Sequence, residues 1–491
     1  MPPYHPILGH FGALARCERR VAHDSSVDRL FGRLSLPFTD TGMHYVDLWP
    51  FASPLLVVTS AAGAAQVQRL GLGLPRGVCG QLDVVTGGES LLTMTGARWA
   101  RWRRALGPGF SSGGAARFVG RAAREVGVFR DVLAERAREG ALFRLEDLTL
   151  RLTLDVIGSV TMGARFQHQE RDNPVAEALM TIISWNNYEA TMNPLTKYLS
   201  AGWLVQWYNG RRMNRYIHAR IDEQLAGASS SSSSPCSKSI LSLAASAILE
   251  DGDNDDDANN DIAADFKAAM TSHIRLFLFA GHDATSTTLV FAYHHLTQRP
   301  EWLALVRAEH DAVFGPSPSS SSSKQQQQQH RLSTEPALLN ALPRTLAVIK
   351  EVLRLHPPSS KMTEGRDGAD LVDGAGRVLP TAGCYVWVLH GMVHVDPADW
   401  ERPDEFLPER WLGGAAYRPF GQGPRSCIGQ ALAVMVLKVA LVMTLRDFDV
   451  VPAHDEWSRL RGDGGRKKRA ERPTAEHPSD GYPCRVRLRK V

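Results

Sequence analysis

The 491-residue sequence lacks any uninterrupted run of about 18 apolar residues, the length that a membrane-crossing helix needs. The most apolar stretch, 431–445, is interrupted by Lys438 and is better explained as a buried helix. Net charge is also small, and a formal charge of +4 argues against a nucleic-acid partner. Apolar residues make up 43% of the chain, which is ordinary for a globular protein and sufficient for a core.

The cysteines lack the spacing of a disulfide framework or of a metal-ligand cluster. Five of the six are scattered along the chain: Cys17, Cys79, Cys236, Cys384 and Cys484. Such scattering indicates reduced thiols in a cytosolic environment. The sixth, Cys427, has a different sequence context.

Cys427 lies in the segment 420–429, Phe-Gly-Gln-Gly-Pro-Arg-Ser-Cys-Ile-Gly, which is followed by an apolar helical pattern. Backbone N–H groups of a glycine-rich loop can donate to a thiolate, and a helix N-terminus adds positive potential. This setting predicts the axial thiolate ligand of a haem iron. The alternative for a lone cysteine is a buried free thiol.

Four other residues of this loop have types that suit haem binding. Gly423 and Gly429 would allow the backbone to approach the porphyrin closely, where a Cβ would obstruct it. Phe420 could shield the sulfur from water and so tune the redox potential. Arg425 is placed to meet a haem propionate by charge-assisted hydrogen bonds.

Four further motifs occur in the order found in the cytochrome P450 family, which the chain resembles from about residue 90 to its C-terminus. They are Trp99-x-x-x-Arg103, Ala280-Gly281-His282-Asp283, Glu351-x-x-Arg354 and Pro403 to Trp411. The resemblance implies a mainly α fold with a small β-rich region, in one domain spanning 1–491. It also implies haem b as the cofactor.

The Glu351 motif implies a structural cluster. Glu351 and Arg354 are three residues apart on a predicted helix and share one face, and Arg410 could supply a second guanidinium. In the family this cluster holds the cysteine loop. The alternative is an exposed helix ion pair worth a few tenths of a kcal/mol.

The resemblance also assigns residues to the haem propionates and to the distal side. Trp99 and Arg103 share a helical face and meet one propionate in the family, and Arg366 is a further expected partner. On the distal side we expect Gly281 to leave room for dioxygen and Asp283 to relay protons.

The family places threonine directly after this acid, but here Ala284 stands there and Thr285 follows. One residue turns a side chain by about 100° around the helix, so Thr285 is not expected to replace it. We still expect Thr285 to be among the catalytic residues, with an ordered water or a substrate hydroxyl completing the relay.

Periodicity predicts helices over 265–298, 301–314 and 347–355, and strands near 383–389 and 484–490. Low-complexity surface loops are expected at 228–238, 250–261 and 316–330. Residues 1–12 resemble the proline-rich hinge that follows a membrane anchor in eukaryotic relatives, with no anchor in this sequence.

The expected function is a haem-thiolate monooxygenase of the fungal secondary-metabolism type, which hydroxylates or epoxidises a lipophilic small molecule. The resemblance implies an NADPH–cytochrome P450 reductase, cytochrome b5 as a second partner, and the cytosolic face of the endoplasmic reticulum membrane. The substrate pocket is expected from 81–95, 182–207 and 276–284. The alternatives are an isomerase or dehydratase that does not use dioxygen, and a non-catalytic haem-binding protein.

Basic residues flank the cysteine loop: Arg410, Arg418, Arg425 and Lys438. They could form a patch for an acidic electron donor. They could equally be a solvated face together with propionate anchors.

Overall fold

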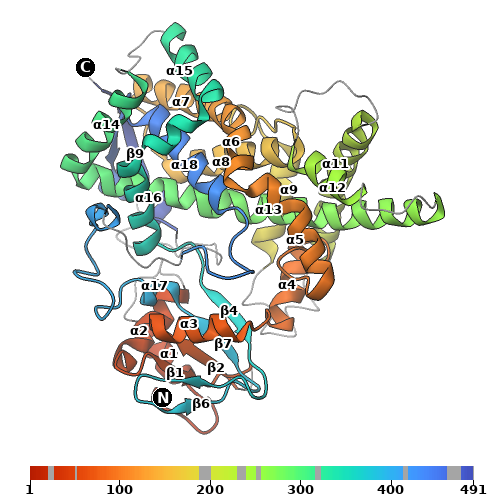
Figure 1. Cartoon of the computed structure of the whole chain (residues 1–491). Coiled ribbons are helices and arrows are strands. Elements are labelled where there is room, and N and C mark those ends of the chain that lie inside the picture. The colour runs from red at the N-terminus through yellow and green to blue at the C-terminus, as the bar shows by residue number, and fades with distance from the viewer. Residues whose placement is uncertain are drawn as a thin grey trace.

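The computed structural model describes residues 1–19, 27–49, 52–186, 201–228, 239–249, 256–315, 322–412, 419–461 and 477–489. Helices dominate, as predicted, and the strands form three small sheets (Figure 1). The described helices include none with the length and apolar character that a membrane crossing requires.

Residues 11–298 supply twelve of the described α-helices. They are α1 (Phe11–Glu18), α2 (Val27–Ser35), α3 (Ala61–Leu70), α4 (Arg76–Thr86), α5 (Gly96–Phe110), α6 (Ser112–Arg117), α7 (Val119–Glu139), α8 (Leu145–Met162), α9 (Pro174–Trp185), α11 (Gly202–Ala228), α12 (Ile240–Leu249) and α13 (Asp256–Gln298). The later ones are α14 (Pro300–Phe314), α15 (Ser322–Thr334), α16 (Pro343–Leu355), α17 (His390–Val393), α18 (Gln430–Thr444) and α19 (His454–Arg461). Short 3-10 helices are η1 (Leu36–Phe38), η4 (Pro336–Ala341), η5 (Pro408–Trp411) and η6 (Ser479–Gly481).

The sheets are small and lie at the edges of the helical body. One sheet has the order β1 (Met43–Val46), β2 (Leu55–Val58), β7 (Tyr385–Val388) and β4 (Lys361–Glu364). A second has the order β3 (Phe143–Arg144), β9 (Pro483–Leu488) and β8 (Phe448–Pro452), and a third pairs β5 (Leu371–Val372) with β6 (Val378–Leu379). The strands predicted near 383–389 and 484–490 are thus confirmed as β7 and β9.

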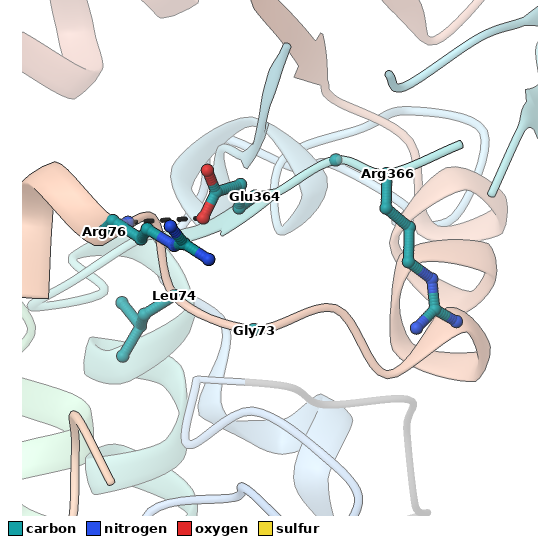
Figure 2. A pocket seen from close by; sticks show the side chains of 6 residues that line it. Gly73, Leu74, Arg76, Glu364 and Arg366 are labelled. Atoms are coloured by element: carbon teal, nitrogen blue, oxygen red, sulfur yellow. Dashed lines mark hydrogen bonds between the residues drawn. The ribbon is translucent and has the colours of Figure 1, made fainter. Parts of the chain in front are cut away.

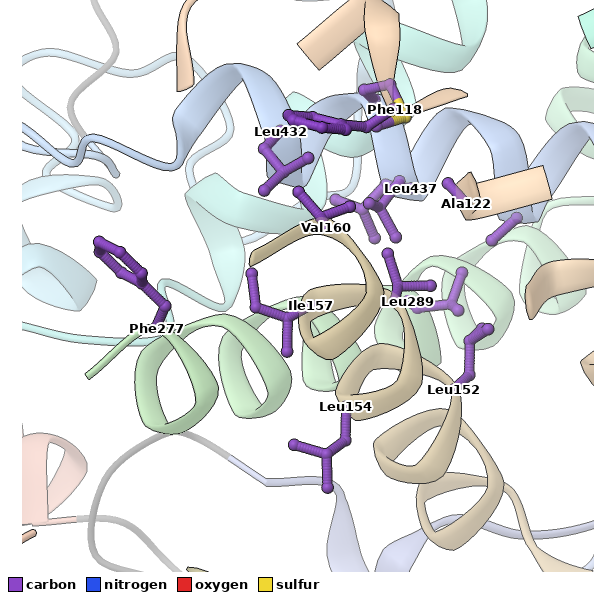
Figure 3. Close-up of a cluster of buried hydrophobic side chains, with 14 of the residues drawn as sticks. Phe118, Ala122, Leu152, Leu154, Ile157, Val160, Phe277, Leu289, Leu432 and Leu437 are labelled. Atoms are coloured by element: carbon purple, nitrogen blue, oxygen red, sulfur yellow. The ribbon is translucent and has the colours of Figure 1, made fainter. Parts of the chain in front are cut away.

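The long helix α13 crosses the helical body and packs along α8 (Figure 1). Apolar and small residues surround both helices on nearly all sides, which is the pattern of buried helices. In Figure 3, Val160 of α8 lies near Leu432 and Leu437 of α18, and Leu289 of α13 belongs to the same cluster. Each fully buried side chain of this size contributes about 1.5–3 kcal/mol.

Two of the predicted low-complexity loops are helical where the structure describes them, so these predictions are wrong. Residues 256–261 form the start of α13. Residues 322–330 belong to α15, because glutamine is a good helix former and Gln328 and Leu332 are buried. The segments 229–238, 250–255 and 316–321 lie outside the described residues.

Candidate functional site

The Cys427 loop is a tight turn that ends at the start of α18. The Cys427 N–H donates to the Phe420 carbonyl at 2.8 Å, and the Ser426 N–H donates to the Gly423 carbonyl at 3.0 Å. Gly423 has a φ of +81°, which a side chain would strain. A Cβ on Gly429 would lie 3.9 Å from the Cys427 sulfur, so glycine keeps the space beside the sulfur open.

The charge environment of Cys427 contains opposing contributions. Burial among protein atoms raises the pKa of the thiol, whereas the Gly429 N–H, the Arg103 guanidinium and the Gln430 N–H favour the thiolate. The Cys427 side chain is nevertheless exposed. A sulfur can bind a metal only if one side of it is accessible, and the exposure of Cys427 meets that condition. A bound metal would displace the thiol proton.

Cationic side chains gather around this loop. Arg103 of α5 donates to the Ser426 carbonyl at 3.0 Å. Arg425 donates to the Met94 carbonyl at 2.7 Å, and its guanidinium lies 4.2 Å from the centre of the Trp99 ring. Because both arginines bond to carbonyls, their positive charges remain available to an anionic ligand.

Lys361, at the start of β4, is a member of this cluster that the sequence analysis missed. Burial lowers the pKa of its ammonium group, and the charge of Arg425 lowers it further. Arg366, the residue predicted for this role, is exposed and donates to the Leu70 carbonyl at 3.4 Å. Lys361 and Arg366 are five residues apart, which is about 16 Å of extended chain, so their side chains cannot occupy the same place.

Arg366 instead lines a separate cavity of about 330 Å³ between the α3–α4 connection and the turn after β4. Figure 2 shows Arg366 on one side of it and Arg76 on the other. The Arg76 N–H donates to Glu364 at 3.3 Å. The structure therefore favours Lys361 over Arg366 as a neighbour of the Cys427 loop.

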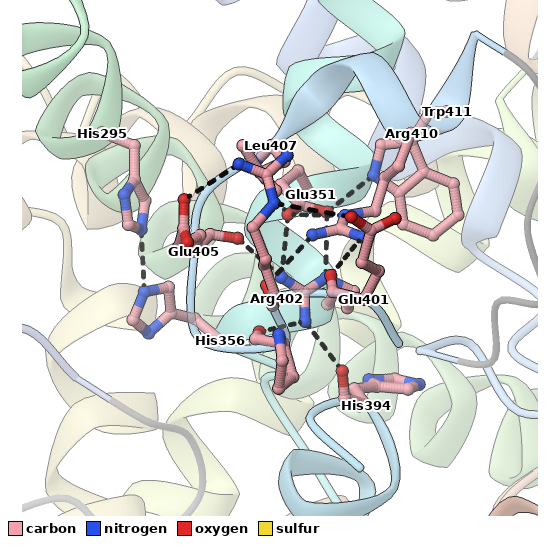
Figure 4. A network of polar contacts seen from close by, with 12 residues as sticks. His295, Glu351, His356, His394, Glu401, Arg402, Glu405, Leu407, Arg410 and Trp411 are labelled. Carbon is pink, nitrogen blue, oxygen red and sulfur yellow. Dashed lines mark hydrogen bonds and ion pairs between the residues drawn. The ribbon is translucent and has the colours of Figure 1, made fainter. Parts of the chain in front are cut away.

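Glu351, Arg354 and Arg410 come together in one buried network (Figure 4). Arg354 binds the Glu351 carboxylate with Nε at 2.9 Å and Nη2 at 2.8 Å, and Arg410 Nε adds a contact of 3.1 Å. Trp411 Nε1 and the Leu407 N–H complete the carboxylate's partners at 2.8 and 2.9 Å. The sequence analysis gave Trp411 no role, although its place beside Arg410 was a usable signal.

The remaining donors of Arg354 bind the backbone that leads to the cysteine loop. They reach the carbonyls of His394, Pro403 and Glu405 at 2.8, 2.6 and 3.0 Å. Both charged side chains of the central pair are fully buried. A buried charge pair needs this saturation, because an unpaired charge there would cost several kcal/mol.

The proposed basic patch for an electron donor is wrong for two of its residues. Lys438 is buried, and its Nζ donates to the Leu339 carbonyl at 2.8 Å, while Arg410 is held by Glu351. Arg418 lies outside the described residues. The exposed basic residues on the helix that contacts Ser426 are Arg101 and Arg104, together with Arg98, which is paired with Glu89.

On α13, one face is open in an otherwise buried stretch. Ala280 is exposed and Ala284 is half-buried, and residues four apart share a helix face. Gly281 has a packing role, since a Cβ there would lie 3.0 Å from Cγ1 of Ile157 on α8. The small side chains on the open face are thus those of Ala280 and Ala284. Thr285 is buried.

Asp283 is buried next to this face and contacts a histidine that the sequence analysis missed. His477 Nε2 lies 3.6 Å from Asp283 Oδ2, and His477 Nδ1 hydrogen-bonds to Glu146 Oε1. Burial lowers the pKa of His477, but Asp283 and Glu146 outweigh it and raise the value to about 9. No local pattern around His477 signalled this contact.

The arrangement fits an iron porphyrin. Cys427 offers an accessible sulfur, and Arg103, Arg425 and Lys361 supply positive charge that suits two propionates. Ala280 and Ala284 leave space on α13. The other predicted residues, Phe420 and Trp99, lie against the main core cluster.

Comparisons with known proteins identify the family of this chain. A family model described as Cytochrome P450 matches residues 48–466. Cytochrome P450 monooxygenase polC of Polytolypa hystricis is 32% identical over 99% of this chain and 89% of its own length. Cytochrome P450 monooxygenase acrF of Aspergillus aculeatus is 31% identical, over 86% and 87% respectively. The crystal structure of the cytochrome P450DA heme domain superposes with a TM-score of 0.75 at 23% identity, covering 100% of this chain and 97% of that chain.

Proposed function

The chain belongs to the cytochrome P450 family and is a haem-thiolate monooxygenase, and from that premise we propose that Cys427 is the axial ligand of its haem b. The observation that carries the proposal is the accessible Cys427 sulfur beside the N–H groups of Gly429 and Gln430. Those N–H groups stabilise negative charge on the sulfur and reduce its basicity.

The cations around the loop would hold the cofactor's propionates. Arg103 and Arg425 already bond to the backbone, so their side chains are oriented before an anion binds. A propionate beside Lys361 would favour its charged form, because it would offset the burial that lowers the pKa of the ammonium group. The Arg425 guanidinium lies over the Trp99 ring, a cation–π contact that favours this position of the side chain.

When bound, the haem iron supplies the dioxygen chemistry that hydroxylates a C–H bond or epoxidises a double bond. The chain's own residues shape the distal side. Ala280 and Ala284 provide a small apolar wall, and Asp283 lies one residue before Ala284, where it can pass protons inward. Thr285 is buried to the same extent as Asp283, and we keep it among the proposed catalytic residues.

The substrate we propose is a lipophilic small molecule of secondary metabolism, by analogy with the fungal relatives. Three stretches would form its pocket: 81–95, 182–186 with 201–207, and 276–284. Residues 187–200 of the predicted pocket lie outside the described part of the chain. The alternative isomerase or dehydratase reaction has no specific observation in its favour, and it predicts turnover without dioxygen or reductase.

Electrons would come from NADPH through a cytochrome P450 reductase, with cytochrome b5 as a second donor. Arg101 and Arg104 support this, because they are exposed on α5, the helix that contacts the Cys427 loop through Arg103. An acidic reductase surface would be attracted there. Reversing both charges should raise the reductase concentration needed for half-maximal reduction, whereas reversing Arg138, exposed on α7, should not.

Membrane association at the endoplasmic reticulum is supported by exposed aromatic residues. Trp185 ends α9, and Trp203, Trp207 and Tyr208 lie at the start of α11. Such side chains favour the headgroup region of a bilayer. Trp203→Ser with Trp207→Ser should reduce co-sedimentation with phospholipid vesicles, while Trp49→Ser, at an equally exposed site, should not. Equal losses would reject this surface.

The function is tested by the reduced carbon monoxide difference spectrum of protein produced with haem. The wild type should give the long-wavelength Soret band of a thiolate-ligated haem, and Cys427→Ser should abolish it. Cys384→Ser, a change at a half-buried thiol outside the Cys427 loop, is the control and should retain the band. Retention in Cys427→Ser would show that the ligand is misassigned.

A further inference from the structure

Three segments far apart in the chain meet at His477. Glu146 is in the first turn of α8, Asp283 is in the middle of α13, and His477 precedes η6. His477 and Glu146 are 331 residues apart in sequence. The side chains of all three are at most 10% exposed, so the imidazole lies between two buried carboxylates.

The two contacts of His477 differ in strength. The Nδ1 contact to Glu146 Oε1 is within hydrogen-bond distance, while the Nε2 contact to Asp283 Oδ2 is 3.6 Å, an ion-pair distance longer than a hydrogen bond. Glu146 therefore anchors the ring. Asp283 is farther from the ring and makes an ion-pair contact with it.

We propose that His477, anchored by Glu146, is the positioning residue that orients Asp283 and returns a proton to it during turnover. The inference rests on the proposed function, because it assigns Asp283 the delivery of protons at the distal side. His477 acts through Asp283 and does not itself reach the open face formed by Ala280 and Ala284.

The proton step balances within these groups. After Asp283 passes a proton toward the open face it is a carboxylate. The Nε2–H bond of the His477 imidazolium then breaks and an O–H bond forms at Asp283 Oδ2. The imidazole is left neutral, with its remaining proton on Nδ1 facing Glu146. A proton from bulk water restores the imidazolium before the next turnover.

Charged groups around His477 come from β3, α8, α13 and η6. Glu146 and Asp147 lie in the first turn of α8, and Arg144 at the end of β3 directly precedes them, with its Nη2 3.9 Å from Glu146 Oε2. Asp283 faces the ring from α13, and Asp480 lies in η6, where its backbone carbonyl accepts from Arg144 Nε at 3.0 Å. Arg144 is 41% exposed, so solvent is close to the Glu146 end.

The same pair of helices offers a matched control. The hydroxyls of Thr149 on α8 and Ser286 on α13 hydrogen-bond at 2.7 Å, and both residues are buried. This contact joins the same two helices without a titratable group. Thr149→Val therefore reproduces the loss of a helix–helix contact while leaving the three charged residues intact.

The experiment has one readout that does not need turnover and one that does. In a histidine-labelled holoenzyme, NMR titration should give His477 a pKa of about 9, and that value should fall toward the ordinary 6.5 in Asp283→Asn. In His477→Asn, product formed per NADPH should fall on the order of tenfold, and the alkaline decline of coupling should disappear. Thr149→Val should keep the wild-type pH profile.

Two results would overturn the proposal. One is a His477 pKa near 6.5 in the wild type, and the other is a His477→Asn enzyme with the coupling and pH profile of Thr149→Val. A stabilising contact alone would lower stability in both variants without moving the pH profile. The carbon monoxide spectrum of each variant separates these outcomes from a failure of the proposed function, since that failure removes the thiolate signature from the wild type as well.

Discussion

Two buried charge networks among the described residues, one around Glu351 and one around His477, are built in opposite ways. The Glu351–Arg354–Arg410 network has permanently charged arginines, and Glu351 accepts hydrogen bonds from Leu407 and Trp411 as well. The Asp283–His477–Glu146 network has a titratable group at its centre and a loose contact of 3.6 Å. The first can only hold the backbone in place, whereas the second can gain and lose a proton.

The largest effect is expected at the fixed network. Glu351→Gln keeps the shape of the side chain but leaves Arg354 and Arg410 without their counter-charge. We expect a loss of about 3–5 kcal/mol in the free energy of unfolding, together with loss of bound haem. Chemical denaturation and haem content measure this.

Glu405→Gln is the control for that change. The Glu405 side chain is 47% exposed and pairs with Arg402 at 3.5 Å, so its loss should cost under about 1 kcal/mol. Equal losses in the two variants would remove the distinction between a buried, saturated network and an ordinary surface pair.

The titratable network should make stability depend on pH. The folded-state pKa of His477 is raised to about 9 from 6.5, so its stabilising contribution is complete below pH 6.5 and is lost as pH rises through 9. The loss is at most on the order of 3 kcal/mol. Denaturation curves between pH 6 and 10 should show this decline in the wild type and a flatter profile in His477→Asn.

A third effect concerns the contact between the helices that carry the distal network. Gly281→Val places a side chain against Ile157, where even a Cβ would approach within 3.0 Å. We expect a cost of about 1–3 kcal/mol in unfolding free energy. Adding Ile157→Ala should recover part of it, because the shorter side chain makes room; additive losses would show that the two positions do not touch.

The smallest effect is expected at Ala284. Ala284→Thr adds a hydroxyl on the half-buried open face next to Asp283. If His477 already supplies protons to Asp283, product formed per NADPH should rise by less than about twofold in the wild-type background. In the His477→Asn background the gain should be larger. A large gain in the wild type would mean that the relay is impaired as it stands.

The difference between the networks also explains what the sequence could predict. Glu351 and Arg354 are one helical turn apart, and the Cys427 loop is contiguous, so local spacing alone places them together. His477 meets Glu146 across 331 residues, and its neighbours in the chain carry no pattern that points to α8 or α13. Lys361 was missed for another reason, since its position depends on where β4 begins.

The prediction of loops at 250–261 and 316–330 is wrong for the described residues because a polar, low-complexity composition does not by itself prevent a helix from forming. The Gln-rich helix α15 is ordered by its own helix propensity and by burial of Leu332. Such tertiary support cannot be read from a polar tract alone.

The most direct test of the whole account is X-ray absorption at the iron edge of the purified, haem-loaded protein. We predict one sulfur ligand to iron in the wild type and its loss in Cys427→Ser. A wild-type iron coordinated only by nitrogen and oxygen would contradict the assignment of Cys427.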